Sequence, residues 1–515
     1  MSRSLTFLGC LGTALLLCLG SCTKPEENKG SSWDDLFGRE DEDNGEYVTS
    51  GKSTLELPYL MSDGMVLQQN CDANIWGKAT PGAKITVTTS WSSEEFFCKV
   101  PDDGVWTVPV KTPAATFTPQ TVTIHDSQSG GKRISDVLIG EVWLTAGQSN
   151  MEQCMRGFGS IANGNYQPIK DFETELKDAD IPGFRYFKDK YQLSDTPQFN
   201  TKSSEWTPSS PTNSLEFQAI AYFFGRKLSR DLNVPVGIIG CAYGGSRIEA
   251  WMSRASLNKF PASDWKDTAD LGKKEGDTDK QIPAQIYNGM VLPAINYTVK
   301  GIMWYQGESN RDNSSAYSAL LQEMVKSWRA LKNDKDAKIP FYIVQLAAFT
   351  SSDELGTARM RDAQMDAFDK IPNSGIVNAS DCGSKETIHY PDKRTPAERL
   401  VLWAESKDYG ISTVNPMAPR ATDLAVNGEK AVVTLSNARG LKLAEGRTSV
   451  SFAKIAGADG VFRDASVSIE GETLVFTSPQ VKAPVSVRYC YCSWCEGSVY
   501  NADGLPVFPF ELKKN

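Results

Sequence analysis

Three short segments of the chain carry residues suited to acyl-transfer chemistry, and each follows a run of apolar residues. Residues 147–151 read Gly-Gln-Ser-Asn-Met, residues 243–246 read Tyr-Gly-Gly-Ser, and residues 304–310 read Trp-Tyr-Gln-Gly-Glu-Ser-Asn. A serine at a strand-to-helix turn can expose its hydroxyl as a nucleophile, and a preceding glycine permits the sharp turn. Backbone N–H groups at paired glycines and neutral amide side chains can stabilise an oxyanion. This pattern predicts Ser149 as the nucleophile of a hydrolase.

Such a nucleophile needs a base, and the chain contains only two histidines. His125 lies in a predicted β-strand, where an ordinary surface residue is expected. His389 follows the last predicted parallel strand and precedes a helix, so it is the candidate base. Glu386 stands three residues earlier and can turn back to orient the imidazole ring. Asp381, at the end of the preceding strand, is the second candidate for this acid, and a Ser149–His389 dyad without an acid is the third possibility.

The elements that position these residues are predicted from hydrophobic periodicity. Short apolar runs typical of buried parallel strands occupy residues 136–146, 234–242, 299–305, 339–347 and 375–379. Helical periodicity occupies residues 316–331, 357–368 and 397–405. Strands that alternate with helices predict a doubly wound α/β/α domain over residues 136–410, with its site at the carboxyl ends of the strands. The polar segments 155–215 and 255–285 are expected to form loops over those ends.

The regions on either side of this domain show a different pattern. Short β-like runs separated by turn signals fill residues 54–135 and return over residues 411–515. Strands at this spacing predict a β-sandwich domain at each end of the α/β domain.

The N-terminal segment indicates export. The apolar stretch 7–19 is too short for a stable membrane span, and residues 1–21 are predicted to be a signal peptide. Residues 19–22 read Leu-Gly-Ser-Cys and resemble the bacterial lipobox, so we expect a lipid on Cys22 and an outer-membrane lipoprotein of a Gram-negative bacterium, facing the cell surface or the periplasm. An ordinary signal peptide is the alternative.

An acidic segment follows the candidate lipidation site. Residues 26–46 contain nine acidic and two basic side chains, so this stretch repels itself and buries little apolar surface. Residues 22–53 are therefore predicted to be an extended tether. It resembles the surface-export signals of some lipoproteins, and a plain solvated spacer is the alternative.

Charge and cysteine content restrict the partners. The net charge of −9 and the absence of a Lys/Arg cluster argue against nucleic acid as a partner. Export makes disulfides possible, with Cys71 and Cys98, or two among Cys490, Cys492 and Cys495, as candidate pairs. With two histidines and no second cysteine cluster at zinc-site spacing, we expect neither a metal nor another cofactor.

Together these motifs resemble the sialate O-acetylesterase family of SGNH-type serine esterases. The likeness runs from about residue 55 to the end of the chain. It is carried by residues 57–58, 65–68, 147–151, 244–251, 304–310, 500–501 and 504–506. The resemblance implies an SGNH-type α/β/α hydrolase domain with flanking β domains.

The resemblance also implies roles for particular residues. Ser149 matches the nucleophile and His389 the base, while Gly244 and Gln306 match oxyanion positions, with Asn310 as an alternative. The family commonly has Asp-Ile-His-Pro where this chain has Thr-Ile-His-Tyr over residues 387–390. The identity of the orienting acid therefore stays open, with Glu386 preferred over Asp381.

The activity implied is removal of O-acetyl groups from sialic acids. The sugar carboxylate would bind Arg247, unless this side chain forms an internal salt bridge with Glu249 or Glu308. Two other functions remain open. One is deacetylation of xylan or another polysaccharide, and the other is glycan binding by an inactive surface lipoprotein.

Overall fold

The computed structural model describes residues 55–128, 130–159 and 167–514. The predicted signal peptide, Cys22 and the acidic tether lie outside the described residues. Within the described ranges, no helix is both long enough and apolar enough to cross a membrane.

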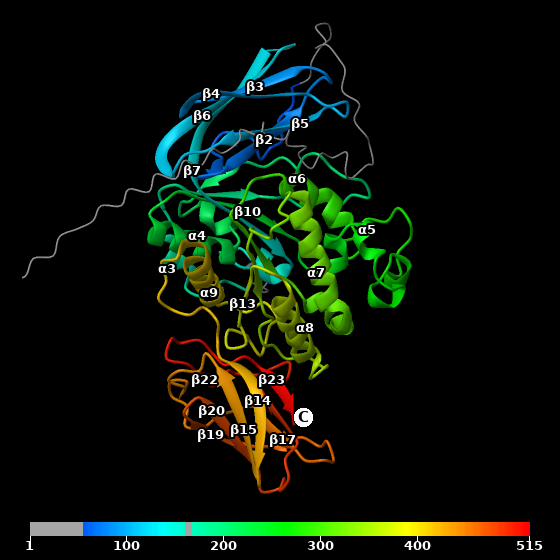
Figure 1. The fold of residues 1–515 in the computed structure, drawn as a ribbon, viewed down its shortest axis with the longest axis vertical. Coiled ribbons are helices and arrows are strands. Elements are labelled where there is room, and N and C mark those ends of the chain that lie inside the picture. Colours follow the sequence, from blue (N-terminus) through cyan, green and yellow to red (C-terminus); the bar gives the residue numbers. More distant parts are fainter. Residues whose placement is uncertain (1–54, 129, 160–166, 515) are drawn as a thin grey trace, which may run out of the picture. The chain divides into compact units, whose positions relative to one another are not determined.

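A mainly parallel β-sheet forms the core of the α/β region, as predicted (Figure 1). The order of its strands is β13 (Ser374–Val377), β12 (Phe341–Val344), β11 (Gly301–Tyr305), β7 (Gly130–Gly147), β10 (Val236–Ala242), β8 (Phe184–Lys188) and β9 (Trp206–Pro208). All neighbours pair in parallel except β8 and β9. Every residue of β10 and β11 is buried, which explains why these strands read as continuous apolar runs.

Helices cover both faces of this sheet. Trp143 on β7 packs against Phe224 of α4 (Ala219–Leu232), while Trp304 on β11 packs against Trp328 of α7 (Ser314–Leu331). The register pairs Trp304 with Ala146, so alternation along β7 places Trp143 and Trp304 on opposite faces.

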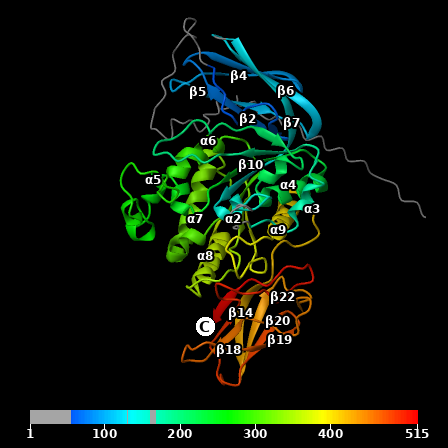
Figure 2. The same cartoon turned by 180° about the vertical axis from the view of Figure 1, so that it is seen from behind.

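Two helix pairs build these layers. Helix α9 (Arg394–Ala404) packs against α4, and α8 (Gly356–Lys370) packs against α7, as the views from both sides show (Figures 1 and 2). Shorter helices lie in the connections: α2 (Ser149–Glu152), α3 (Phe172–Leu176), α5 (Arg254–Leu257) and α6 (Leu292–Ile295). The doubly wound α/β architecture is confirmed.

One strand belongs to two parts of the fold. The first half of β7 pairs with β6 (Thr116–Asp126) in antiparallel fashion, and its second half pairs with β10 in the parallel sheet. The predicted domain boundary at residue 136 therefore falls inside a continuous strand.

The expectation that residues 155–215 form loops was wrong for β8, which joins the central sheet within that segment.

The N-terminal β region consists of short strands. Besides β6 they are β1 (Val66–Gln68), β2 (Asp72–Lys78), β3 (Lys84–Thr89), β4 (Ser92–Lys99) and β5 (Val105–Lys111). Strand β3 pairs with β4 and β6, and β2 pairs with β5. His125 is exposed on β6, as expected for a surface residue outside the active site.

Two antiparallel sheets form the C-terminal β region. One contains β14 (Arg420–Asn427), β15 (Lys430–Ser436), β20 (Thr473–Thr477) and β19 (Ser466–Glu470); the other contains β18 (Arg463–Asp464), β17 (Ala453–Ala456), β21 (Ser486–Tyr489) and β23 (Phe510–Lys513). A two-stranded sheet joins β16 (Lys442–Leu443) to β22 (Val499–Tyr500). Phe476 of the first sheet and Phe510 of the second meet in one core, which is the arrangement of a β-sandwich.

The candidate disulfides are not formed. All eight cysteines in the described part of the chain are free thiols, including Cys71, Cys98 and the three near the C-terminus. Cys71 instead hydrogen-bonds to the Gln68 carbonyl, and the Arg361 guanidinium lies 3.8 Å from the Cys495 sulfur. The predicted pairs were therefore wrong, and the Cys495 thiol instead forms hydrogen bonds with Cys490 and Cys492.

Candidate active site

Ser149 lies where the sequence predicted it, at the turn between β7 and α2. Gly147 ends the strand with φ at 141°, a conformation that L side chains rarely adopt. A Cβ on this glycine would also collide with the carbonyl oxygen of Tyr305 on the neighbouring strand. Gln148 precedes the helix and Ser149 is its first residue, half-buried at the carboxyl edge of the sheet. The turn therefore requires glycine and presents the serine to the site.

Gly244 lies beside Ser149, the candidate nucleophile. A Cβ placed on this glycine would stand 3.5 Å from the Ser149 Cβ and 2.5 Å from a carboxylate oxygen of Glu152. The backbone N–H of Gly244 faces the Glu152 carboxylate and lowers its pKa, although burial, the larger effect, raises it. A side chain at position 244 would therefore displace this carboxylate.

The predicted amide donors are both buried and both have internal partners. The Gln306 amide nitrogen donates to the Ser246 carbonyl at 3.1 Å and to the Asn310 side-chain oxygen at 2.8 Å. The Asn310 amide nitrogen donates to Glu249 at 2.8 Å. These bonds connect the second and third motif segments. To serve as oxyanion donors, the two amides would have to exchange the bonds that they make here.

Arg247 does not present its charge to a ligand. Its side chain is 5% exposed and pairs with Glu249 at 3.2 Å and with Asp312 at 2.9 Å. It also donates to the Ser309 carbonyl at 2.6 Å. The expected substrate-binding role is therefore not supported, and the alternative of an internal salt bridge to Glu249 is the arrangement found. Asp312 was not anticipated, because it approaches Arg247 only through tertiary packing.

His389 is half-buried on the loop that precedes α9. Its ring packs edge-on against Phe158, with the ring centroids 4.9 Å apart. Burial and, to a lesser degree, the nearby Lys393 ammonium lower the pKa of His389 from 6.5 to about 4. The ring is therefore neutral at physiological pH, which is the state that a general base requires.

Neither candidate acid hydrogen-bonds to this ring. Glu386 is exposed and accepts a hydrogen bond from Ser384 at 3.0 Å. Asp381 forms a bidentate ion pair with Arg399, both distances being 2.7 Å, and also accepts from the Tyr500 hydroxyl at 3.1 Å. Across the described ranges of the chain, no carboxylate lies within hydrogen-bond distance of the His389 side chain.

A buried polar network joins helix α2, which begins at Ser149, to the loop that carries His389. The side-chain oxygen of Asn150 accepts from the Lys393 ammonium at 2.7 Å, and its amide nitrogen donates to Glu308 at 2.5 Å. The same nitrogen donates to the Ile388 carbonyl at 3.2 Å. Lys393 also lies over the Tyr390 ring, 3.4 Å from its centroid. Asn150, the residue after Ser149, thus connects the third motif segment with the loop that carries His389.

Burial shifts the pKa values of the charged members of this network. It lowers the pKa of Lys393 to about 7, against the opposing effect of Glu308, and it raises the pKa of the Glu308 carboxyl. The sequence indicated Glu308 only as a possible salt-bridge partner of Arg247 and gave no role for Lys393. The available signal was their position, since Glu308 lies in the third motif segment and Lys393 follows the histidine by four residues.

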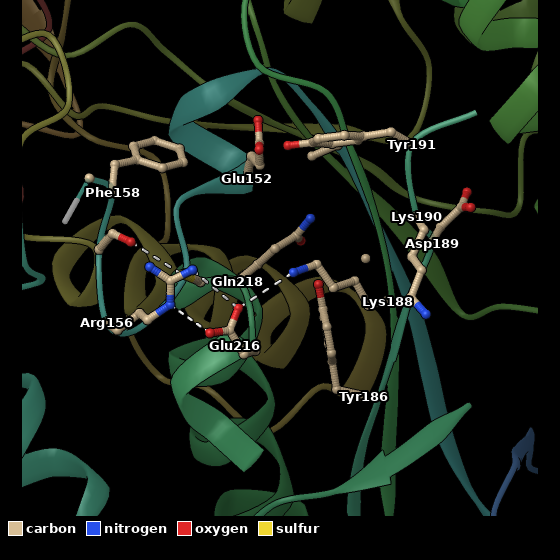
Figure 3. Close-up of a pocket in the computed structure, with 15 residues that line it drawn as sticks. Glu152, Arg156, Phe158, Tyr186, Lys188, Asp189, Lys190, Tyr191, Glu216 and Gln218 are labelled. Atoms are coloured by element: carbon tan, nitrogen blue, oxygen red, sulfur yellow. Dashed lines mark hydrogen bonds and ion pairs between the residues drawn. The ribbon is translucent and has the colours of Figure 1, made fainter. Parts of the chain in front are cut away.

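A cavity of about 340 Å³ opens at the carboxyl edge of the sheet (Figure 3). Its lining includes Glu152, which follows Ser149 on α2, and Phe158, which packs on the His389 ring. Other lining side chains come from β8 and its following loop, among them Tyr186, Lys188 and Tyr191. The cavity is large enough for a sugar ring and lies where an α/β sheet binds its ligands.

A doubly wound α/β/α fold with a serine at the carboxyl edge of its sheet is typical of SGNH-type esterases. A model of the family described as carbohydrate esterase, sialic acid-specific acetylesterase, matches residues 139–398. The chain belongs to this family and is a carbohydrate esterase.

Individual relatives agree with this assignment. Sialate O-acetylesterase of Mus musculus is 28% identical over 422 residues, which cover 71% of this chain and 76% of that protein. The Homo sapiens protein of the same name is 28% identical over 414 residues, covering 73% and 75%. The crystal structure of a carbohydrate acetylesterase from Xanthomonas citri superposes with a TM-score of 0.77 and 32% identity, covering 89% of this chain and 100% of that one.

Proposed function

We propose that this esterase removes O-acetyl groups from sialic acids, with Ser149 as nucleophile and His389 as base. The observation that carries the mechanism is the meeting of Ser149 and Gly244 at one edge of the sheet, with a neutral histidine on the adjacent loop. The substrate is supported by the family description and by the names of the mammalian relatives.

In the proposed reaction His389 takes the proton of Ser149 as its hydroxyl attacks the acetyl carbonyl. The N–H groups of Ser149 and Gly244 hold the oxyanion, for which the Glu152 carboxylate must move away from the Gly244 N–H. The imidazolium then protonates the departing sugar oxygen. Water, activated by the same histidine, attacks the acetyl-enzyme and releases acetate.

A second substrate class, neutral acetylated polysaccharides such as xylan, is favoured by one observation. Arg247, the cation expected to bind a sugar carboxylate, is held in an internal ion pair. A neutral sugar needs no such cation.

Acetate release from matched glycans tests the proposal. Acetylated sialoglycans and acetylated xylan are compared with the purified wild-type protein, and Ser149→Ala serves as the inactive control. Release from sialoglycans that Ser149→Ala abolishes supports the proposal. A clear preference for acetylated xylan would show that the substrate is a neutral polysaccharide and not a sialic acid. Full activity of Ser149→Ala would refute the mechanism. If the folded wild type hydrolyses no ester, including an aryl acetate, the glycan-binding alternative takes its place.

We also propose that Cys22 carries a lipid that anchors the enzyme to the outer membrane. The support is the Leu-Gly-Ser-Cys sequence behind a short apolar segment. Metabolic labelling with a radioactive fatty acid should label the wild type and leave Cys22→Ser unlabelled. Equal labelling of both refutes the anchor, and Cys18→Ser is the matched control.

A further inference from the structure

Glu152 lies one helical turn after Ser149 and shares its closest surroundings. The point where a Gly244 Cβ would stand is 2.5 Å from a Glu152 carboxylate oxygen and 3.5 Å from the Ser149 Cβ. The carboxylate and the nucleophile therefore flank the same glycine, whose N–H is the proposed oxyanion donor. In the proposed reaction Glu152 only moves away from the Gly244 N–H.

The carboxylate also borders the cavity next to the nucleophile (Figure 3). The charged and titratable groups that act on it are Lys188 on β8, Lys280 on the loop before α6, and Tyr243 after β10. Lys188 lies 3.7 Å from Glu216, which in turn pairs with Arg156. Glu152 itself forms no salt bridge with a described residue, so one of its oxygens is available to a ligand.

An aromatic surface adjoins this carboxylate. Tyr191 stacks on Tyr243 with a centroid distance of 4.2 Å and an interplanar angle of 25°. The outer ring, Tyr191, is 44% exposed and lines the cavity. In Figure 3 its hydroxyl end points toward Glu152. An exposed aromatic face beside a carboxylate suits a sugar ring, whose C–H face packs on the aromatic ring while a hydroxyl donates to the carboxylate.

We propose that this cavity is the sugar subsite and that Glu152 accepts a hydrogen bond from the hydroxyl next to the acetyl ester. The inference rests on the proposed function, because Ser149 fixes where the ester carbonyl must lie. That carbonyl lies between Ser149 and the Gly244 N–H, so the neighbouring ring substituent is the sugar group closest to Glu152. The substrate class is a sugar acetate with a free hydroxyl on the adjacent carbon.

This contact has a consequence for the oxyanion site. A sugar hydroxyl that donates to the available oxygen of Glu152 draws the carboxylate toward the sugar and away from the Gly244 N–H. A substrate that carries the hydroxyl frees the N–H for the developing oxyanion, whereas an ester without it leaves the N–H bound to the carboxylate. The hydroxyl thus raises kcat as well as binding.

The test measures kcat/KM on matched esters. The sugar substrates are 9-O-acetyl-N-acetylneuraminic acid with its 8-deoxy analogue, and methyl 2-O-acetyl-xyloside with its 3-deoxy analogue; 4-nitrophenyl acetate is the simple ester. The enzymes are wild type, Glu152→Ala, Glu152→Gln and, as control, Glu94→Gln, which alters an exposed carboxylate on β4. Thermal unfolding checks that each variant is folded.

Wild type and Glu94→Gln should prefer the hydroxyl-bearing member of the pair by roughly 10- to 100-fold, the range for a hydrogen bond to a charged group. Glu152→Ala should lose this preference, and Glu152→Gln should keep part of it because its amide oxygen still accepts. Equal losses on hydroxyl-bearing, deoxy and simple esters would overturn the inference, and so would an unchanged preference in folded Glu152→Ala. Activity of Ser149→Ala would instead refute the proposed function, so the two failures are distinguishable.

Discussion

Replacing Lys393 with methionine tests how the buried network acts on the candidate base. Methionine keeps an unbranched side chain and removes the ammonium that lies 2.7 Å from Asn150. Burial is the main reason that the pKa of His389 is lowered to about 4, and Lys393 is the second. At the pH where His389 titrates, Lys393 is protonated, because its own pKa is about 7. Removing the charge should therefore raise the pKa of His389.

The sign of the activity change follows from the role of the base. Neutral His389 is the active form, so kcat/KM falls as the pH drops through its pKa. In Lys393→Met this acid limb should move to higher pH than in wild type, while remaining below 6.5 because burial is unchanged. The variant also leaves the buried Asn150 oxygen without its donor, which should cost about 1–3 kcal/mol of the free energy of unfolding.

The assay is hydrolysis of 4-nitrophenyl acetate between pH 3.5 and 8, with denaturant unfolding at pH 7. Lys385→Met is the matched control, because it removes an exposed lysine from the same loop and should change neither quantity. If Lys393→Met unfolds, Asn150→Ala disconnects the network without removing the charge and should lower kcat while leaving the acid limb in place. The reasoning would be refuted if the acid limb of the kcat/KM profile in folded Lys393→Met lay at the same pH as in wild type or at a lower pH.

Three further predictions concern the nucleophile, the acid and the turn. Ser149→Ala should lower kcat about 1,000-fold or more with the unfolding midpoint unchanged; a residual activity of several per cent would contradict this. Glu386→Gln should be nearly as active as wild type because the Glu386 carboxylate is exposed. Asp381→Asn should lower the free energy of unfolding by about 3 kcal/mol, because it leaves buried Arg399 without its anion. A large loss of activity in Glu386→Gln, with Asp381→Asn as active and as stable as wild type, would restore Glu386 as the orienting acid. Gly147→Ala should fail to fold or lose nearly all activity, since φ at 141° and the Tyr305 carbonyl exclude a Cβ, and a stable active variant would show that the turn is not needed.

The sequence was sufficient to predict the central sheet and the position of Ser149 at its carboxyl edge. Strands buried on both faces must be apolar throughout, and β10 and β11 are recognisable for that reason. The carboxyl ends of parallel strands meet at one edge, so Ser149 and Gly244 had to approach each other. The boundary at residue 136 could not be located in the same way, because β7 changes partners without a break.

Side-chain partners were harder to predict, because they depend on contacts between distant segments. Arg247 was expected to face substrate, yet Asp312, 65 residues away, neutralises it together with Glu249. Lysine is rarely buried, and nothing near Lys393 in the chain indicates that Asn150 would receive its ammonium. These contacts appear only when three loops meet.

The position of the histidine is therefore best explained by the whole set of loops rather than by one acid. Asn150 fixes the backbone before His389 through the Ile388 carbonyl, and Phe158 packs against the ring. Lys393 follows on the same loop and is held by the same Asn150 side chain. A carboxylate next to the ring would raise the pKa of the histidine and orient it at once. Here packing and backbone contacts provide orientation, while burial and the Lys393 charge keep the ring neutral, so the base is weaker but is available over a wider range of acidic pH.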